Sequence, residues 1–132
     1  MKIVLDTNVL VAALVADGLC RDLVRRRVRG HELCTSDALL KELTATLRGK
    51  FRVPVGDVPW LAEYRARATV VKAQPLPAPV CRDPDDDAVL ATALAAQADA
   101  IIIGDDDLLT LKNHADIPIL SPRQFLEHLD RL

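Results

Sequence analysis

The chain opens with Lys2-Ile-Val-Leu-Asp-Thr-Asn-Val-Leu10, and this stretch decides the fold. Residues 2–5 form a short, mostly apolar run that predicts a strand, and the run stops at the charged Asp6. The apolar stretch that begins at Asn8 is longer and ends near Gly18, which predicts a helix. The opening unit is therefore a strand, an acid at its carboxyl end, and a helix.

The same order of elements recurs along the chain. A strand is predicted over 32–35, and Ser36 is a suitable N-cap for a helix from Asp37 to Arg48 that stops at Gly49. Further predicted elements are helices over 19–29, 60–68, 84–97 and 122–132, strands over 69–73, 100–103 and 118–120, and a short helix after residue 105. Alternating strands and helices favour an α/β fold, here a three-layer α/β/α sandwich with a mostly parallel central sheet.

Composition limits the classes of function. At 132 residues, the whole of 1–132 is expected to form a single domain, and 50% hydrophobic residues suffice for a core. Only 3% of residues are aromatic, which excludes an RNA-binding platform of stacked rings. The formal net charge of -2 gives no global attraction for phosphate, so any nucleic acid must be bound by local basic patches.

The cysteines and the apolar segments indicate a protein of the cytoplasm. The 3 cysteines show no spacing typical of a zinc site, and reduced thiols are expected. No apolar run reaches the roughly 18 residues that a membrane span needs. We therefore expect a cytoplasmic protein that makes no use of a membrane.

Acidic residues follow the predicted strands. Asp6 follows the first strand, Asp105 follows the apolar strand over 100–103, and residues 85–87 are aspartates at the start of the helix before it. Glu42 lies on the flank of the apolar stripe of its helix. Ligand sites of parallel sheets lie beyond the carboxyl ends of the strands, so we expect these acids to gather there.

A cluster of carboxylates needs a counter-charge. Two like charges about 4 Å apart repel by on the order of 4 kcal/mol at the effective dielectric near a protein surface. Oxygen ligands without His or Cys suit Mg²⁺ or Mn²⁺ better than Zn²⁺. Such an ion can polarise a phosphoryl oxygen and activate water, which indicates phosphodiester hydrolysis.

Other catalytic motifs are missing from the sequence. There is no glycine-rich dinucleotide or P-loop motif and no serine-hydrolase elbow. His31, His114 and His128 are scattered, and none is expected to act as a catalytic base.

Four segments in the same order resemble the PIN-domain ribonucleases, especially VapC-like toxins of type II toxin–antitoxin systems. The segments are Lys2 to Leu10, Ser36-x-x-Leu-Leu-x-Glu42, Arg82-Asp-Pro-Asp-Asp-Asp87-Ala-Val-Leu-Ala-Thr-Ala and Ile103-Gly-Asp105-Asp-Asp107-Leu-Leu. The resemblance spans essentially the whole chain. It implies a PIN-like α/β/α sandwich and Mg²⁺- or Mn²⁺-dependent cleavage of RNA. It also implies a cognate antitoxin as partner, and frequently a homodimer.

The resemblance also implies roles for individual residues. Asp6, Glu42, Asp87 and Asp105 would be the catalytic, metal-binding acids, with Asp86 as the alternative for the third. Thr7, Asn8, Asp86 and Asp107 would orient the metal-bound water or the ligands.

Basic and apolar residues suggest further contacts. Arg25 and Arg26, in the helix over 19–29, and Arg48, Lys50 and Arg52, close to Glu42, are candidates for RNA binding. The apolar positions from Val53 to Tyr64 are interpreted as ordinary packing, or as a face for an antitoxin helix or a second copy.

Two alternatives remain at this stage. One is a catalytically weak or degenerate PIN-like module that only binds RNA. The other is an acidic-pocket phosphohydrolase, against which stands the lack of a second Asp two residues after Asp6.

Overall fold

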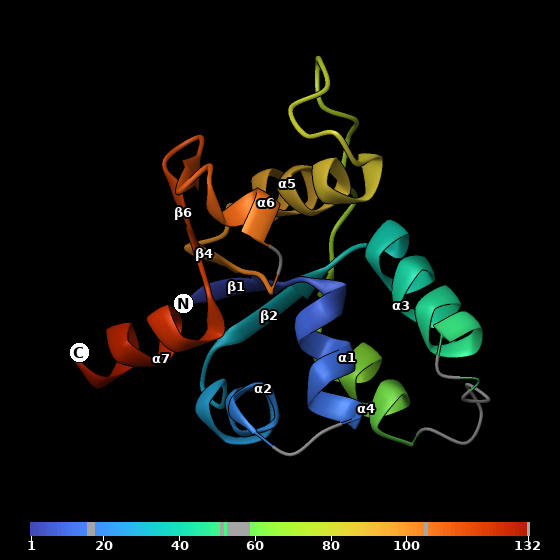
Figure 1. Cartoon of the computed structure of the whole chain (residues 1–132), viewed down its shortest axis with the longest axis vertical. Coiled ribbons are helices and arrows are strands. Elements are labelled where there is room, and N and C mark those ends of the chain that lie inside the picture. Colours follow the sequence, from blue (N-terminus) through green and yellow to red (C-terminus); the bar gives the residue numbers. More distant parts are fainter. Residues whose placement is uncertain (16–17, 51, 53–58, 105, 132) are drawn as a thin grey trace.

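In a computed structural model, six strands form one sheet in the order β3-β2-β1-β4-β6-β5 (Figure 1). The structure describes residues 1–15, 18–50, 52, 59–104 and 106–131, without the side chains of residues 59, 60, 106 and 107. Every neighbouring pair is parallel except β5 and β6, which confirms the mostly parallel sheet. The strands are β1 (Lys2–Leu5), β2 (Glu32–Thr35), β3 (Thr69–Val70), β4 (Ala100–Ile102), β5 (Asn113–His114) and β6 (Ile117–Leu120).

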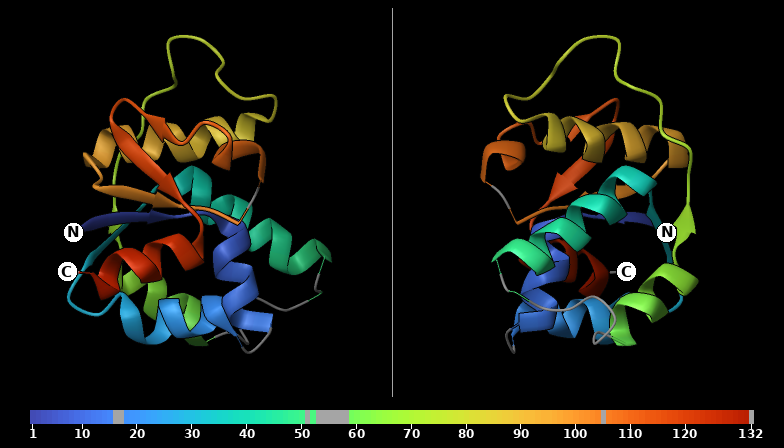
Figure 2. Two further views of the ribbon diagram at one scale, coloured as in Figure 1. Left: turned by 60° about the vertical axis from the view of Figure 1, so that its left-hand side comes forward. Right: turned by 90° about the vertical axis from the view of Figure 1, so that its right-hand side faces the viewer.

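Helices cover both faces of the sheet, so the three-layer sandwich is confirmed (Figure 2). α5 and α6 lie on one face, α1, α2, α4 and α7 lie on the other, and α3 flanks the end of the sheet (Figure 1). The helices are α1 (Thr7–Val15), α2 (Leu19–Asp22), the π-helical η1 (Leu23–Arg27), α3 (Asp37–Lys50), α4 (Pro59–Arg67), α5 (Pro84–Ala96), α6 (Asp106–Leu109) and α7 (Pro122–Asp130). Within the described residues, no helix has both the length and the apolar character of a membrane span.

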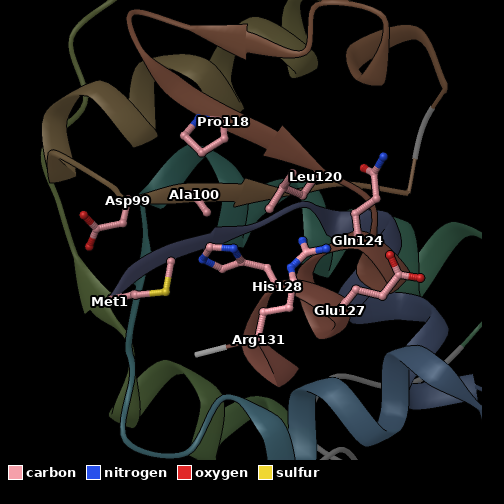
Figure 3. Close-up of a pocket in the computed structure, with 9 residues that line it drawn as sticks. All are labelled: Met1, Asp99, Ala100, Pro118, Leu120, Gln124, Glu127, His128 and Arg131. Atoms are coloured by element: carbon pink, nitrogen blue, oxygen red, sulfur yellow. The ribbon is translucent and has the colours of Figure 1, made fainter.

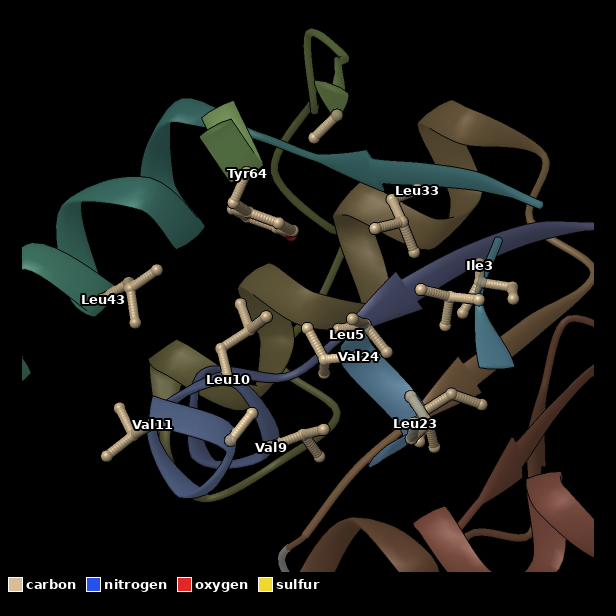
Figure 4. Close-up of a cluster of buried hydrophobic side chains, with 14 of the residues drawn as sticks. Ile3, Leu5, Val9, Leu10, Val11, Leu23, Val24, Leu33, Leu43 and Tyr64 are labelled. Carbon is tan, nitrogen blue, oxygen red and sulfur yellow. The ribbon is translucent and has the colours of Figure 1, made fainter. Parts of the chain in front are cut away.

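Two apolar clusters, one on each face, hold the layers together. Successive side chains of a strand point to opposite faces, so Ile3 and Leu5 pack under the sheet with α1 while Val4 packs against α5. Figure 4 shows the larger cluster, in which aliphatic side chains from β1, β2, α1 and η1 pack together and Tyr64 lies at one side. The parallel strands are thus held in one register, which aligns their carboxyl ends.

Local sequence signals start and stop the helices that surround these ends. Asp83 caps α5, because its side chain accepts a hydrogen bond from the backbone N–H of Asp85 at 2.9 Å, and Pro84 follows it. Ser121 and Gln124 form a reciprocal capping box at the start of α7. Both helices therefore begin where the sequence predicts.

Two predicted boundaries were wrong, and a loop that the prolines and glycine of 50–59 predict is mostly untested. α3 runs through Gly49 to Lys50, because a glycine near a helix end costs only about 1 kcal/mol and the preceding turn is anchored by buried Leu47. β3 ends at Val70 rather than at residue 73, because β2 ends at Thr35 and offers no further pairing partner. The predicted loop over 50–59 lies mostly outside the described residues.

One hairpin was not predicted at all. β5 and β6 are joined by Ala115 and Asp116, both with positive φ (49° and 66°). Turns of this kind usually carry Gly or Asn, so a turn built from Ala and Asp leaves little signal in the sequence.

Candidate metal and active site

Asp6 lies at the centre of the candidate site, at the carboxyl end of β1, and only 4% of its surface is exposed. One carboxylate oxygen accepts a hydrogen bond from the backbone N–H of Asn8, and the other accepts one from that of Gly104, each at 3.4 Å. The Asp6 N–H itself donates to the carbonyl of Ile102 at 3.0 Å. The side chain is thus fixed between the start of α1 and the segment that follows β4.

Glu42 provides the second carboxylate. It lies on α3 beside the buried stripe that contains Leu39 and Leu43, and it is partly exposed. Burial, together with the negative charges of Asp85, Asp6 and Asp83, raises the pKa of Glu42 to about 7. The Thr7 hydroxyl lowers this pKa, because it acts as a hydrogen-bond partner of the carboxylate. Glu42 therefore lies in a field of negative charge contributed by β1 and by the start of α5.

Thr7 and Asn8 lie where the sequence places them, directly after Asp6. Thr7 is 2% exposed and faces Glu42, although its Oγ1 has no partner within strict hydrogen-bond geometry in the described part of the chain. The side chain of Asn8 is exposed, and its backbone N–H is what contacts Asp6. A buried hydroxyl beside two carboxylates is a further oxygen donor for the site.

Asp87 is directed away from Asp6 and Glu42. Its carboxylate accepts a hydrogen bond from the N–H of Cys81 at 2.8 Å, and its two oxygens share the N–H of Val80, each at 3.3 Å. Burial alone would raise its pKa, but these hydrogen bonds and the charge of His114 lower it overall. The structure therefore brings Asp85, rather than Asp87, toward Glu42, and Asp87 organises the loop before α5.

The signal for Asp85 was present in the sequence but was missed. Asp85 lies seven residues before Thr92, so the two share one face of α5. The Thr92 hydroxyl bonds that of Ser36 at 2.8 Å, at the start of α3. The face of α5 that carries Asp85 is thus the face turned to the helix of Glu42. Asp86, partly exposed, borders a hollow with Cys81 and Thr110 instead.

The last two predicted acids cannot be placed. Asp105 lies outside the described residues, and the side chain of Asp107 is not described. Among the residues that are described, no three His, Cys, Asp or Glu side chains are close enough to hold a metal ion. The described part of the site therefore consists of Asp6, Glu42 and Thr7, with further acids at the start of α5.

This oxygen-rich set fits a hard divalent cation. Carboxylate and hydroxyl oxygens are the ligands that Mg²⁺ and Mn²⁺ prefer. Burial, and then repulsion from the neighbouring acids, holds the pKa of Glu42 well above its ordinary value, and a cation at this position would relieve that repulsion.

The basic residues that were candidates for RNA binding fall into two groups. Arg25 is exposed, and Arg26 pairs with Asp22 at 3.8 Å. Arg48 and Lys50 are exposed in the last turns of α3, and Arg52, also exposed, follows them.

The apolar segment beyond them is only partly described. Leu61 and Tyr64 are buried in the core, which agrees with ordinary packing, and residues 53–58 lie outside the described chain.

A large hollow lies away from Asp6 and Glu42. A hollow of about 930 Å³ between α7 and the starts of β1 and β4 includes Met1, Ala100 and His128 (Figure 3). His31 contacts the N-terminal amine at 3.2 Å, and His114 lies in β5. The hollow contains neither Asp6 nor Glu42.

A family model described as PIN domain matches residues 2–107 of this chain. The chain belongs to the PIN domain family. PIN domains are generally nucleases that bind RNA and usually depend on divalent metals, so the carboxylates at the end of β1 lie where chemistry is expected. An uncharacterized protein of Methanocaldococcus jannaschii is 28% identical over 148 residues, which cover 99% of this PIN domain and 93% of the relative.

Proposed function

We propose that this PIN domain is a Mg²⁺- or Mn²⁺-dependent endoribonuclease that hydrolyses RNA phosphodiester bonds. One observation carries the proposal: the buried Asp6 lies at the end of a central parallel strand, beside Glu42, whose pKa is raised to about 7 in part by neighbouring acids. Buried acids with perturbed pKa values and oxygen donors around them are typical of functional sites.

The residues of the chain have distinct tasks in this proposal. Asp6 and Glu42 hold the cation, and the Thr7 hydroxyl orients Glu42. Asp105, and Asp107 behind it, complete the ligand set as proposed from the family resemblance. A bound Mg²⁺ or Mn²⁺ supplies a Lewis acid and lowers the pKa of water.

The third acid comes from the start of α5. Asp87 remains a prediction as a metal ligand, but its hydrogen bonds to Val80 and Cys81 favour a structural role. We propose Asp85 or Asp86 for this position, because Asp85 acts on Glu42 and Asp86 is its partly exposed neighbour.

Cleavage of RNA tests the function directly. The purified protein should cut a labelled single-stranded RNA with Mn²⁺ or Mg²⁺, and EDTA should stop the reaction. Asp6→Asn should abolish cleavage, while Asp116→Asn, the same exchange at an exposed turn, should cut as the wild type does. Equal cutting by Asp6→Asn would refute the assignment. RNA binding with no cleavage by the wild type would favour a non-catalytic RNA-binding module.

We further propose that the protein is the toxin of a type II toxin–antitoxin pair. It would act in the cytoplasm, as a homodimer, with its site covered by a cognate antitoxin. The support is the resemblance of the ordered acidic segments to VapC-like toxins, together with membership of the PIN family. Purification from native cells should recover a small partner protein, and induced expression alone should arrest growth. Normal growth with a fully active nuclease would contradict the toxin role.

A further inference from the structure

A second hollow, of about 850 Å³, lies between α3 and α4, and its lining includes several charged side chains. Lys41, Thr44 and Arg48 come from α3, and Arg65 comes from α4. Asp37, at the start of α3, is the one acid among the described residues that line it. Figure 2 (right) shows both helices on this side of the molecule. The lining therefore carries an excess of positive charge in a chain whose net charge is -2.

These positive charges have no ion-pair partner in the described structure. Lys41, Arg48 and Arg65 are exposed, and neither of the recorded salt bridges includes them. The arginines near η1 differ in this respect, because Arg26 and Arg27 are paired with acids. The hollow between α3 and α4 is thus the better site for an anionic ligand.

The hollow and Glu42 lie on neighbouring sides of α3. At about 100° per residue, Lys41, Thr44 and Arg48 share one side of the helix, and Glu42 lies roughly 100° or more around it. Ala38, Ala45 and Gly49 occupy the surface between them, and all three are exposed. A Cβ at Gly49 would meet no atom within 4 Å. A strand that leaves Glu42 can therefore cross α3 without meeting a long side chain.

We propose that this hollow binds the sugar–phosphate backbone of the RNA strand that reaches the carboxylates. Lys41, Arg48 and Arg65 contact phosphates, and Thr44 donates a hydrogen bond. The inference rests on the proposed ribonuclease function and extends it to the path of the substrate. The positive charge of the hollow also offsets the repulsion between phosphate and the acids near Glu42.

The lining favours RNA over an acidic segment of a partner protein. Its apolar members are Ala38, Ala45 and Leu40, and Leu40 is only 8% exposed. The three cations of the lining face a single acid, Asp37, so a chain with one negative charge at every residue complements the hollow best. A phosphate chain needs only charge and hydrogen-bond donors.

Binding can be measured apart from cleavage, in EDTA, by fluorescence anisotropy of a labelled 12-nucleotide single-stranded RNA. The test variant combines Lys41→Gln, Arg48→Gln and Arg65→Gln. The charge-matched control combines Lys72→Gln and Arg123→Gln with Lys112→Gln, three exposed cations that lie outside the hollow. Circular dichroism and thermal melting confirm that both variants fold.

The salt dependence of RNA binding gives the expected size of the effect. Each phosphate contact on a single strand contributes about 0.7 to the slope of log K against log salt, so three contacts contribute about 2. Between 50 and 200 mM salt, the wild type should lose affinity about 20-fold more than the test variant does. The control should keep the wild-type slope.

Each outcome is decisive. An unchanged slope and affinity in the test variant would overturn the inference, as would a wild type that binds no RNA. If the test variant loses binding to a Glu-rich peptide that the wild type binds, and still binds RNA as the wild type does, the hollow is a site for a protein partner. That result would also overturn the inference. If the wild type binds RNA through the hollow but does not cleave it with Mn²⁺, the nuclease proposal fails while this inference stands.

Discussion

Replacing Glu42 by Gln should stabilise the metal-free protein at alkaline pH. The pKa of Glu42 rises from 4.5 to about 7 on folding, mainly through burial and then through the charges of Asp85, Asp6 and Asp83. The folded protein therefore binds this proton more tightly than the unfolded chain does. The resulting stability is fully present below pH 4.5 and is lost as the pH rises through about 7. The neutral amide of Gln removes this dependence.

The size of the stability difference follows from the shift in the pKa of Glu42. A change from 4.5 to about 7 corresponds to about 3 kcal/mol if none of it is screened. Glu42 is partly exposed, so water and salt reduce this to about 1 kcal/mol. For 132 residues, this predicts a melting temperature about 4 °C higher for Glu42→Gln than for the wild type at pH 8.

Thermal melting in EDTA across pH 4.5 to 8 measures the difference between the two proteins. The curves should coincide at pH 4.5 and separate as the pH rises. Glu63→Gln removes an exposed carboxylate from α4 and should show no such separation. With Mg²⁺ added, the wild type should recover the lost stability. A constant difference at every pH, or a wild type more stable than Glu42→Gln at pH 8 in EDTA, would refute this electrostatic account.

Three further predictions concern the start of α5 and the last helix. Asp85→Asn should lower the pKa of Glu42, because Asp85 is the carboxylate that raises it most, and Asp86→Asn should lower it less. Carbon NMR of the Glu42 carboxyl group measures both shifts. Equal shifts would contradict the placement of Asp85 beside Glu42. Asp87→Asn should destabilise the protein at neutral pH through the weakened bonds to Val80 and Cys81. Because its pKa is lowered from 3.8, the loss should disappear as the pH falls below that value, and a loss that persists in acid would argue against the mechanism. Ser121→Ala should cost about 1 kcal/mol in chemical unfolding by opening the capping box of α7, whereas no loss would show that the cap is dispensable.

Most of the fold could be predicted from the sequence because its signals are local. The strand that ends at Asp6 and the helix capped by Ser36 follow from apolar periodicity and capping residues. The hairpin at Ala115 and Asp116 could not be predicted, because the turn contains no glycine. Its left-handed backbone is imposed by the pairing of β5 with β6.

The site could be predicted only in part. Asp6 and Glu42 were chosen as candidates because one follows a strand and the other flanks an apolar stripe, and the structure places them near each other. The direction of each aspartate in the run 85–87 depends on where α5 begins and how it meets α3. That contact joins Ser36 and Thr92, which are 56 residues apart, so short-range patterns do not contain it.

Manganese binding tests the central claim most directly. Isothermal titration calorimetry with MnCl₂ should show binding to the wild type and to Asp116→Asn, and binding should be lost in Asp6→Asn, because Asp6 is the buried carboxylate on which the site is built. If Asp6→Asn folds and binds Mn²⁺ as tightly as the wild type, the acids at the end of β1 are not a metal site, and the account is wrong.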